Sequence, residues 1–338
     1  MNRISVSALD LAVIFEGGDA AAAIARTVKV AQHIEKLGYE RIWLAEHHNM
    51  PNIASSATAV LIGHVAGKTS TLRVGSGGIM LPNHSPLAVA EQFGTLETIY
   101  PGRIDLGLGR APGTDQATAM ALRRNNVESI YSFPSDIKDL QVYFSSTNEH
   151  ARVRAFPGEG LNIPIWILGS STDSAYLAAE MGLPYAFAAH FAPQQFRRAI
   201  QLYRQNFKPS PYLDKPKVLA CVNVIAADTD DEARFLATSM YQLFLGIVTN
   251  NRKPLQPPRM AMDPVHWPEE LRQAVQQMTS CTFIGNKESL FNQLSTFVES
   301  TEVNEIMVTG NIFDEQAKLH SLEILKQVVD DINALPTE

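Results

Sequence analysis

Cysteine, concentrated positive charge and long apolar runs are all scarce in this sequence, and each absence excludes a class of protein. The two cysteines, Cys221 and Cys281, are too few and too far apart for a disulfide framework or a cysteine metal site, which predicts a reducing, cytoplasmic location. The formal net charge is -7 without any Lys/Arg block, so we expect no nucleic-acid partner. No apolar run could cross a bilayer, and Arg3 and Asp10 interrupt the first segment, so we expect neither membrane insertion nor a signal peptide.

Motifs of several other enzyme classes are missing too. The sequence has no lysine-bearing phosphate loop, no G-x-S-x-G elbow and no HExxH pair, which argues against nucleotide hydrolysis, an α/β-hydrolase and a zinc protease. The run Gly107-Leu108-Gly109 lacks the third glycine of a dinucleotide fingerprint. We therefore expect no nicotinamide-binding module.

Apolar runs typical of strands alternate with helical patterns, as in repeated βα units. Near-continuous apolar strands followed by amphipathic helices predict a parallel sheet covered by helices, and eight in series favour one closed (β/α)8 TIM barrel over residues 1–338. A doubly wound sheet is the alternative. The expected strands are Ile4–Leu9, Arg41–Ala45, Leu72–Met80, Arg103–Leu108, Ile163–Leu168, Tyr185–Ala189, Val218–Ala226 and Glu305–Val308. The expected helices include Ala20–Leu37, Ser55–Lys68, Pro86–Ile99, Ala175–Met181 and Glu315–Ile332.

Two connections are longer than one helix. Residues 111–161 follow the fourth strand and residues 229–304 follow the seventh, so both are expected as insertions in βα loops. Because such loops build the sites of barrel enzymes, we interpret both insertions as substrate-pocket walls. The proline-rich stretch 250–268 predicts an irregular segment.

The second strand runs directly into Glu46-His47-His48, the most specific local feature of the sequence. Histidine passes protons near neutral pH and a neighbouring carboxylate can fix its tautomer, so this run suits acid–base chemistry. Neighbouring side chains on an extended chain point in opposite directions, so His47 and His48 should not share a metal ion. The alternative is a pair of histidines bonded to loop backbone. His190, just after the sixth strand, is expected to add a polar group to the pocket.

Glycines and hydroxyls follow three further strands. The third strand lacks side chains at Gly75, Gly77 and Gly78. Either a flat ring approaches the backbone there, or the strand bulges. Arg110 ends the fourth strand and is either a phosphate ligand or an exposed loop arginine. The fifth strand leads into Gly169-Ser170-Ser171-Thr172-Asp173-Ser174, where a helix begins; this is either an anion site or an ordinary N-cap. Strands four and five are barrel neighbours, so Arg110 and this turn should converge on one rim.

In barrel order these segments resemble the bacterial luciferase-like monooxygenase family over nearly the whole chain. The similarity lies in Trp43–His48, in Val74–Pro82 with His84 and Pro86, in Gly102–Arg110, and in Ile163–Ser174 with Gly182–Pro184. The resemblance is strongest to single-chain members of alkanal-monooxygenase type. Gly109 departs from luciferase, which has a reactive cysteine there, and the aldehyde-gating loop is not recognisable in 229–304, so the resemblance does not extend to light emission with a long-chain aldehyde.

The resemblance implies reduced FMN at the barrel mouth, O2 as co-substrate and oxidation of a small aldehyde-like molecule. By position, His47 is the implied catalytic histidine, with Glu46 and His48 as supports, and Gly77-Gly78 is the often cis peptide beneath the flavin ring. Arg110, Ser170 and the turn Thr172–Ser174 are the implied phosphate ligands.

The resemblance also implies a separate flavin reductase and a homodimer, for which the helix Ser55–Lys68 is our expected interface. Three alternatives stay open: an F420-dependent oxidoreductase, a flavin-binding protein without turnover, and a metal-dependent hydrolase using Asp10, Glu46 and His47.

Overall fold

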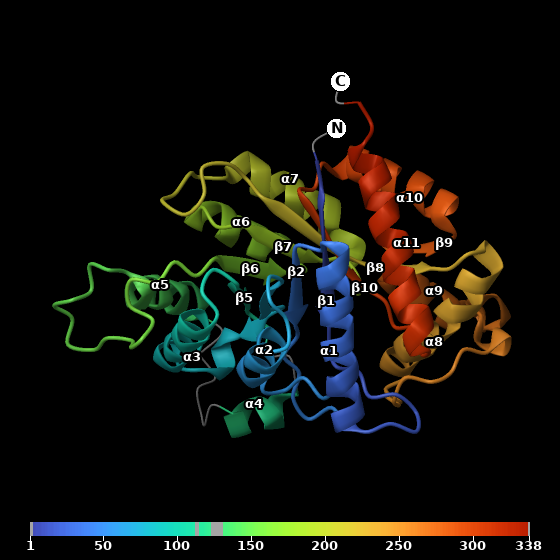
Figure 1. The fold of residues 1–338 in the computed structure, drawn as a ribbon, viewed down its shortest axis with the longest axis horizontal. Helices are drawn as coiled ribbons and strands as arrows, with labels where there is room; N and C mark the ends of the chain where they lie inside the picture. The colour runs from blue at the N-terminus through green and yellow to red at the C-terminus, as the bar shows by residue number, and fades with distance from the viewer. Residues whose placement is uncertain (1–2, 112–114, 123–130, 337–338) are drawn as a thin grey trace.

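The computed structural model describes residues 3–111, 115–122 and 131–336, and within them the sheet closes on itself (Figure 1). Parallel strands pair in the order β10-β1-β2-β3-β5-β6-β7-β8, and β8 pairs with β10 to complete the barrel. The predicted (β/α)8 barrel is therefore confirmed. The strands are β1 Ser5–Asp10, β2 Arg41–Leu44, β3 Arg73–Ser76, β4 Ile79–Met80, β5 Ile104–Gly109, β6 Ile165–Gly169, β7 Tyr185–Ala188, β8 Val218–Ala226, β9 Thr282–Gly285 and β10 Glu305–Thr309.

Helices cover the outside of this barrel (Figure 1). They are α1 Ala20–Leu37, α2 Thr58–Ala66, α3 Pro86–Ile99, α4 Gln116–Leu122, α5 Phe133–Phe144, α6 Thr172–Met181, α7 Phe196–Asn206, α8 Asp230–Val248, α9 Glu269–Met278, α10 Lys287–Thr301 and α11 Glu315–Asn333. The first helix shows how local sequence sets the ends: Asp19 accepts a hydrogen bond from the N–H of Ala22, and Gly38 closes the helix at φ 77°. Among the described residues, none of these helices is both long and apolar enough to cross a membrane.

The structure corrects three predicted elements, one of which is the helix expected over Ala175–Met181, which begins at Thr172. The expected strand Leu72–Met80 is divided into β3 and β4 at Gly77 and Gly78, and β4 pairs with β5. The helix expected to begin at Ser55 begins at Thr58, because the hydroxyl groups of Ser55 and Thr58 donate to the carbonyl oxygen of Ala45 and hold the end of β2. Residues just before the helix are thus used to fix the loop that carries His47.

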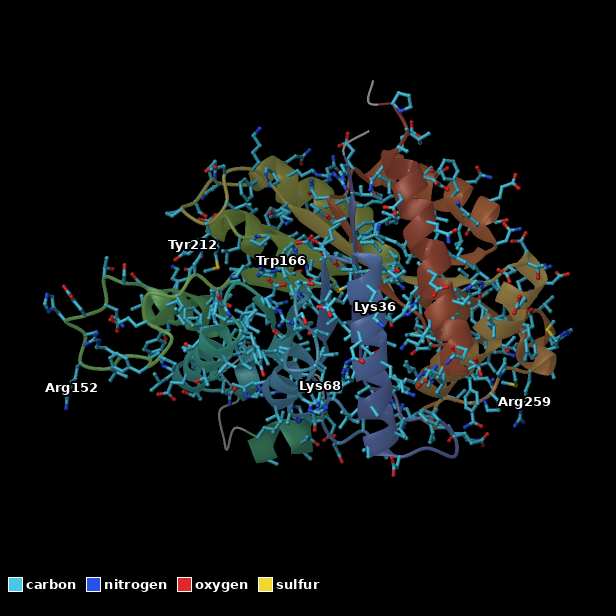
Figure 2. All side chains as sticks on the ribbon, viewed as in Figure 1. Lys36, Lys68, Arg152, Trp166, Tyr212 and Arg259 are labelled. Atoms are coloured by element: carbon cyan, nitrogen blue, oxygen red, sulfur yellow. The ribbon has the colours of Figure 1, made fainter. Side chains whose placement is uncertain are left out.

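The two insertions lie on opposite sides of the barrel. In Figure 1, α5 and α9 lie at opposite ends of the long axis, and Figure 2 places Arg152 and Arg259 near those ends. The second insertion contains a strand that the sequence patterns did not predict: β9 pairs with the end of β8, from Asn223 opposite Thr282 to Ala226 opposite Gly285. Between 250 and 268 the chain forms only two short 3-10 helices, in agreement with the predicted irregular segment.

Aromatic and charged side chains fill the barrel interior. Trp43 and Trp166 pack edge to face with ring centroids 5.4 Å apart, and Figure 2 shows Trp166 near the centre of the molecule. Toward the start of the strands, the buried guanidinium of Arg41 lies 2.6 Å from Asp105 and 2.8 Å from Glu305. Asp105 and Glu305 are fully buried, so this end of the barrel is closed by paired charges.

Candidate active site

The predicted site residues follow the carboxyl ends of neighbouring barrel strands. His47 and His48 come just after β2, Arg110 just after β5, and His190 just after β7. Because the strands are parallel, these groups belong to one face of the barrel, the face on which such enzymes carry their sites.

Glu46 is the centre of a hydrogen-bonded network that holds this face together. Its Oε1 atom lies 2.7 Å from Nε2 of His48 and 2.8 Å from Nε2 of His84, and its Oε2 atom accepts the N–H of Met80 at 3.1 Å. Burial raises the pKa of the Glu46 carboxyl, but the hydrogen bonds and charge of His84, with the hydrogen bonds of His48 and Met80, lower it overall. Glu46 is therefore a fixed acceptor rather than a base.

The same three side chains are the one cluster, within the described ranges, that could hold a metal ion. Ligand atoms of Glu46, His48 and His84 all lie within 4.8 Å of one another. Both imidazoles, however, lie at hydrogen-bond distance from one carboxylate oxygen of Glu46. Each of the three side chains therefore has a hydrogen-bond partner without an ion. His47 lies outside this cluster, as does Asp10, so the set considered for a metal-dependent hydrolase is not brought together.

His47 is held by its backbone, and one nitrogen of its ring has no partner among the described residues. Its N–H donates to the carbonyl of Ser55 at 2.9 Å. The Nδ1 atom is buried and has no hydrogen-bond partner among the residues described. Burial lowers the pKa of His47 to about 4, assisted by the positive charge of Arg252 and by His48, while Glu46 opposes the shift. A neutral imidazole with an open nitrogen can take up a proton.

His190, whose pKa is affected by His47, and its neighbour Asn223 each carry a further buried polar atom. Burial, followed by the charge of His47, lowers the pKa of His190 to about 3, against a hydrogen bond with the backbone of Cys221. Within the described chain, Nδ1 of His190 and Oδ1 of Asn223 have no partner, although the Asn223 amide donates to the carbonyl of His190 at 2.6 Å. Buried polar groups are nearly always satisfied, so these open atoms mark a place for a polar ligand.

The glycines of the third strand are explained by the protein's own packing. A Cβ atom on Gly77 would lie 2.8 Å from Leu9 and 2.9 Å from Trp43, and one on Gly78 would lie 2.8 Å from the carbonyl oxygen of Gly107. The peptide between Gly77 and Gly78 is cis, as the resemblance implied. Close approach by neighbouring strands therefore accounts for glycine here, whether or not a ring also lies above the peptide.

Arg110 and the start of α6 do converge on one rim. Nη2 of Arg110 lies 3.5 Å from the exposed carboxylate of Asp173, in the first turn of α6. The N-cap of α6 is Ser171, which makes no side-chain capping bond, and the N–H of Thr172 donates to Gln195. Helix N-termini and arginine both favour anions, so the rim could hold a phosphate if Asp173 turned away.

Within this segment the side chains serve different purposes. Gly169 and Ser170 are partly exposed. The hydroxyl of Ser174 points into the wall, where it donates to the carbonyl of Ser171 at 2.7 Å and lies 2.9 Å from the hydroxyl of Tyr185. A Cβ atom on Gly169 would collide with the Ser174 side chain. Ser174 therefore shapes the turn, and only its backbone N–H faces the helix end.

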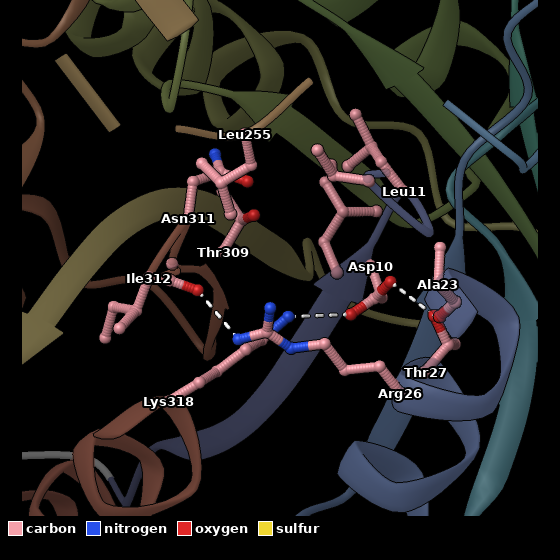
Figure 3. Close-up of a pocket in the computed structure, with 13 residues that line it drawn as sticks. Asp10, Leu11, Ala23, Arg26, Thr27, Leu255, Thr309, Asn311, Ile312 and Lys318 are labelled. Atoms are coloured by element: carbon pink, nitrogen blue, oxygen red, sulfur yellow. Dashed lines mark hydrogen bonds and ion pairs between the residues drawn. The ribbon is translucent and has the colours of Figure 1, made fainter. Parts of the chain in front are cut away.

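A separate polar cavity lies where α1 and α11 meet the ends of β1 and β10 (Figure 3). The carboxylate of Asp10 lies 3.0 Å from Nζ of Lys318 and accepts bonds from Thr27 at 2.8 Å and from the N–H of Ala12 at 2.7 Å. Arg26 donates to the carbonyl of Ile312. The cavity measures about 20 Å³, which is room for about one water, so it is not a cofactor site.

A closed barrel whose mouth carries a neutral histidine, open polar atoms and an anion-favouring rim is the architecture of a small-molecule enzyme. The sequence profile of the luciferase-like monooxygenases matches residues 5–304. The chain therefore belongs to the luciferase-like monooxygenase family.

Proteins with similar sequences align with most of this chain. A protein of Escherichia coli (strain K12) named luciferase-like monooxygenase is 51% identical over 329 residues, covering 97% of this chain and 98% of its own length. The N-acetyl-S-alkylcysteine monooxygenase of Bacillus subtilis (strain 168) is 31% identical over 332 residues, covering 96% and 98%. More distant, at 21% identity with 72% and 74% covered, is the oxygenase component of the flavin-dependent trigonelline monooxygenase of Acinetobacter baylyi.

Solved structures agree on the architecture. The crystal structure of apo-MsnO8 has a TM-score of 0.90 at 31% identity and covers 97% of this chain and 99% of its own. The oxygenating constituent of 3,6-diketocamphane monooxygenase from Pseudomonas putida, in complex with FMN, has a TM-score of 0.75 at 16% identity, covering 99% and 100%. An F420-dependent secondary alcohol dehydrogenase has a TM-score of 0.71 at 14% identity, covering 98% and 99%. At these low identities the last two share the fold.

Proposed function

We propose that this protein is an FMN-dependent monooxygenase that uses O2 to oxidise a small organic, aldehyde-like substrate. The observation that carries the proposal is the buried, unpartnered Nδ1 of His47 at the barrel mouth of a chain from this family. When bound, reduced FMN supplies the electrons that activate O2. The rim at Arg110 and the start of α6 fits the phosphate of such a cofactor, and the open atoms of His190 and Asn223 offer polar contacts to the substrate.

Each residue has a distinct part in this proposal. His47 takes up or returns a proton at Nδ1, while Glu46, with His48 and His84, keeps the loop in place. Arg110 and the segment Gly169–Ser174, which leads into α6, would hold the phosphate once the Asp173 carboxylate turns away, and Gly77-Gly78 would lie under the flavin ring. His190 would add a polar group to the substrate pocket.

Replacement of His47 tests the catalytic part. His47→Gln should bind FMN with nearly the wild-type affinity but lose oxygenation by about 100-fold or more, because general acid–base catalysis contributes about that factor. His150→Gln, at a position whose side chain is 94% exposed, is the matched control. FMN affinity is measured by fluorescence and turnover by product analysis; an unchanged His47→Gln rate contradicts the role of His47.

Cofactor choice has one close alternative. An F420-dependent oxidoreductase would use the same rim, and a relative of this fold is F420-dependent. Titration of the protein with FMN and with F420, each oxidised and reduced, decides between them. A protein that binds flavin tightly but oxidises no candidate would instead be a flavin-binding protein without turnover.

The substrate and partners follow from the same proposal. A separate flavin reductase supplies reduced FMN, as the name "oxygenase component" indicates for the Acinetobacter relative. The Bacillus relative is named for N-acetyl-S-alkylcysteines, so we place these compounds among the candidate substrates beside aldehydes. We further propose a cytoplasmic homodimer that uses α2 at its interface.

A further inference from the structure

The second insertion returns to the barrel mouth and is fixed there by its backbone. The N–H of Leu255 donates to the carbonyl of Ile14, and the N–H of Glu16 donates to the carbonyl of Leu255, both at 2.8 Å. On the other side, the N–H of Asn251 donates to the carbonyl of Gly246 at 2.8 Å. Arg252 therefore lies on a short segment that is tied down before and after it.

The loop under this segment is tied in turn to the loop that carries His47. The N–H of Ile14 donates to the carbonyl of Asn52 at 2.9 Å, and the N–H of Ala54 donates to that of Ala12 at 3.0 Å. Backbone bonds thus connect the three loops that follow β1, β2 and β8. The position of Arg252 relative to His47 is set by this layer and not by a freely moving surface loop.

Arg252 makes no ion pair within the part of the chain that the structure describes. Its Nη1 atom lies 3.1 Å from the sulfur of Met50, three residues after His47, and a thioether is a weak acceptor. The guanidinium has five N–H donors and binds carboxylates through two parallel bonds. It is close enough to His47 for its charge to lower the pKa of that ring. An exposed arginine is ordinarily solvated, but this one lies against Met50, on the loop that carries His47, without an acidic partner among the described residues.

We propose that Arg252 binds a carboxylate of the organic substrate and thereby places the neutral, oxidisable part of that substrate beside His47. The proposal rests on the proposed monooxygenase function and defines its substrate class. Deeper in the mouth the open atoms belong to neutral groups, Nδ1 of His190 and Oδ1 of Asn223. The mouth therefore offers a cation at its rim and neutral polar groups inside, which fits a molecule charged at one end.

Acids compared with their own methyl esters test whether the protein binds the carboxylate of its substrate. The probes are N-acetyl-S-methylcysteine, N-acetyl-S-benzylcysteine and hexanoate, each beside its methyl ester. Calorimetric Kd values for the protein loaded with FMN should favour at least one acid over its ester by about tenfold or more, as hydrogen bonds to charged groups do. If no acid binds better than its ester, the proposal is overturned.

Variants then assign the preference to Arg252. Arg252→Gln should abolish the preference for the acid and leave ester binding unchanged, and Arg252→Lys should restore part of it. Lys253→Gln, at the neighbouring exposed residue, should behave as the wild type. A preference that persists in Arg252→Gln overturns the proposal.

Different results would overturn the substrate inference and the monooxygenase proposal. If FMN binds and reductase-supplied turnover occurs but Arg252→Gln raises KM for acid and ester alike, only the substrate inference fails. If reduced FMN does not bind, the monooxygenase proposal fails, whatever the acid preference in the protein without cofactor.

Discussion

His47 owes its chemical character to its surroundings. The loop after β2 buries Nδ1. Burial and the charge of Arg252 together lower the pKa of the ring to about 4, so the ring is neutral above that pH. An ordinary histidine would be half protonated near pH 6.5. The residue is thus an unprotonated, weakly basic imidazole at every pH near neutrality.

The stability of the protein should depend on this shift. Because the folded pKa of His47 lies below its unfolded value, the unfolded chain binds more protons between pH 6.5 and 4. The stabilisation by the neutral ring is therefore complete above pH 6.5 and is lost as the pH falls toward 4. In urea unfolding at pH 7 and pH 5, His47→Gln should lose less stability than the wild type. An equal loss in both proteins contradicts the lowered pKa.

Residue identities at strand ends were predictable, but side-chain directions were not. The positions of His47 and Arg110 after β2 and β5 follow from the strand pattern, and Arg110 meets the first turn of α6 as expected. Asn223 was missed, although it is the one polar residue inside the apolar run of β8 and that contrast could have revealed it. Arg252 carries no local signal, because its place depends on backbone bonds to distant loops.

At the scale of elements, one buried ion pair connects the first strand to the last helix. Asp10 ends β1, and Lys318 lies in the first turns of α11 (Figure 3). Burial raises the pKa of Asp10, but the charge and hydrogen bond of Lys318, with the bonds of Ala12 and Thr27, lower it overall. The pair therefore holds α11 against the carboxyl end of β1.

Lys318→Met should destabilise the protein by about 3 kcal/mol, because it leaves a buried carboxylate without its cation. Asp10→Asn combined with Lys318→Met should recover much of that loss. The stabilisation by ionised Asp10 is present above its unfolded pKa and is lost as the pH falls through the lower folded value. Urea unfolding at pH 7 measures both variants; a double variant no more stable than the single one contradicts the charge argument.

Element types were predicted well where periodicity was long. The eight barrel strands and α1 follow from apolar patterns that continue for several residues. The four-residue strand β9 did not follow, because Thr282, Phe283 and Ile284 are only half-buried and pair with the part of β8 that extends beyond its pairing with β10. Such a strand is specified by its partner more than by its own sequence.

For the whole molecule, the proposed dimer places exposed apolar side chains of α2 at its interface. Val60 on α2 is 71% exposed, and Ile99 at the end of α3 is 58% exposed. If α2 forms the interface, Val60→Glu should yield monomers, whereas Ile99→Glu should leave the dimer intact. Sedimentation velocity measures both; a dimer that survives Val60→Glu removes α2 from the interface.

The paired charges of Arg41, Asp105 and Glu305 affect how molecules enter and leave the barrel. They close the end opposite the mouth, and Trp43 and Trp166 fill the space above them. Every molecule that reaches His47 must therefore pass the same rim and leave by it. We expect arrivals and departures to occur in a fixed sequence, with the molecule that enters first released last.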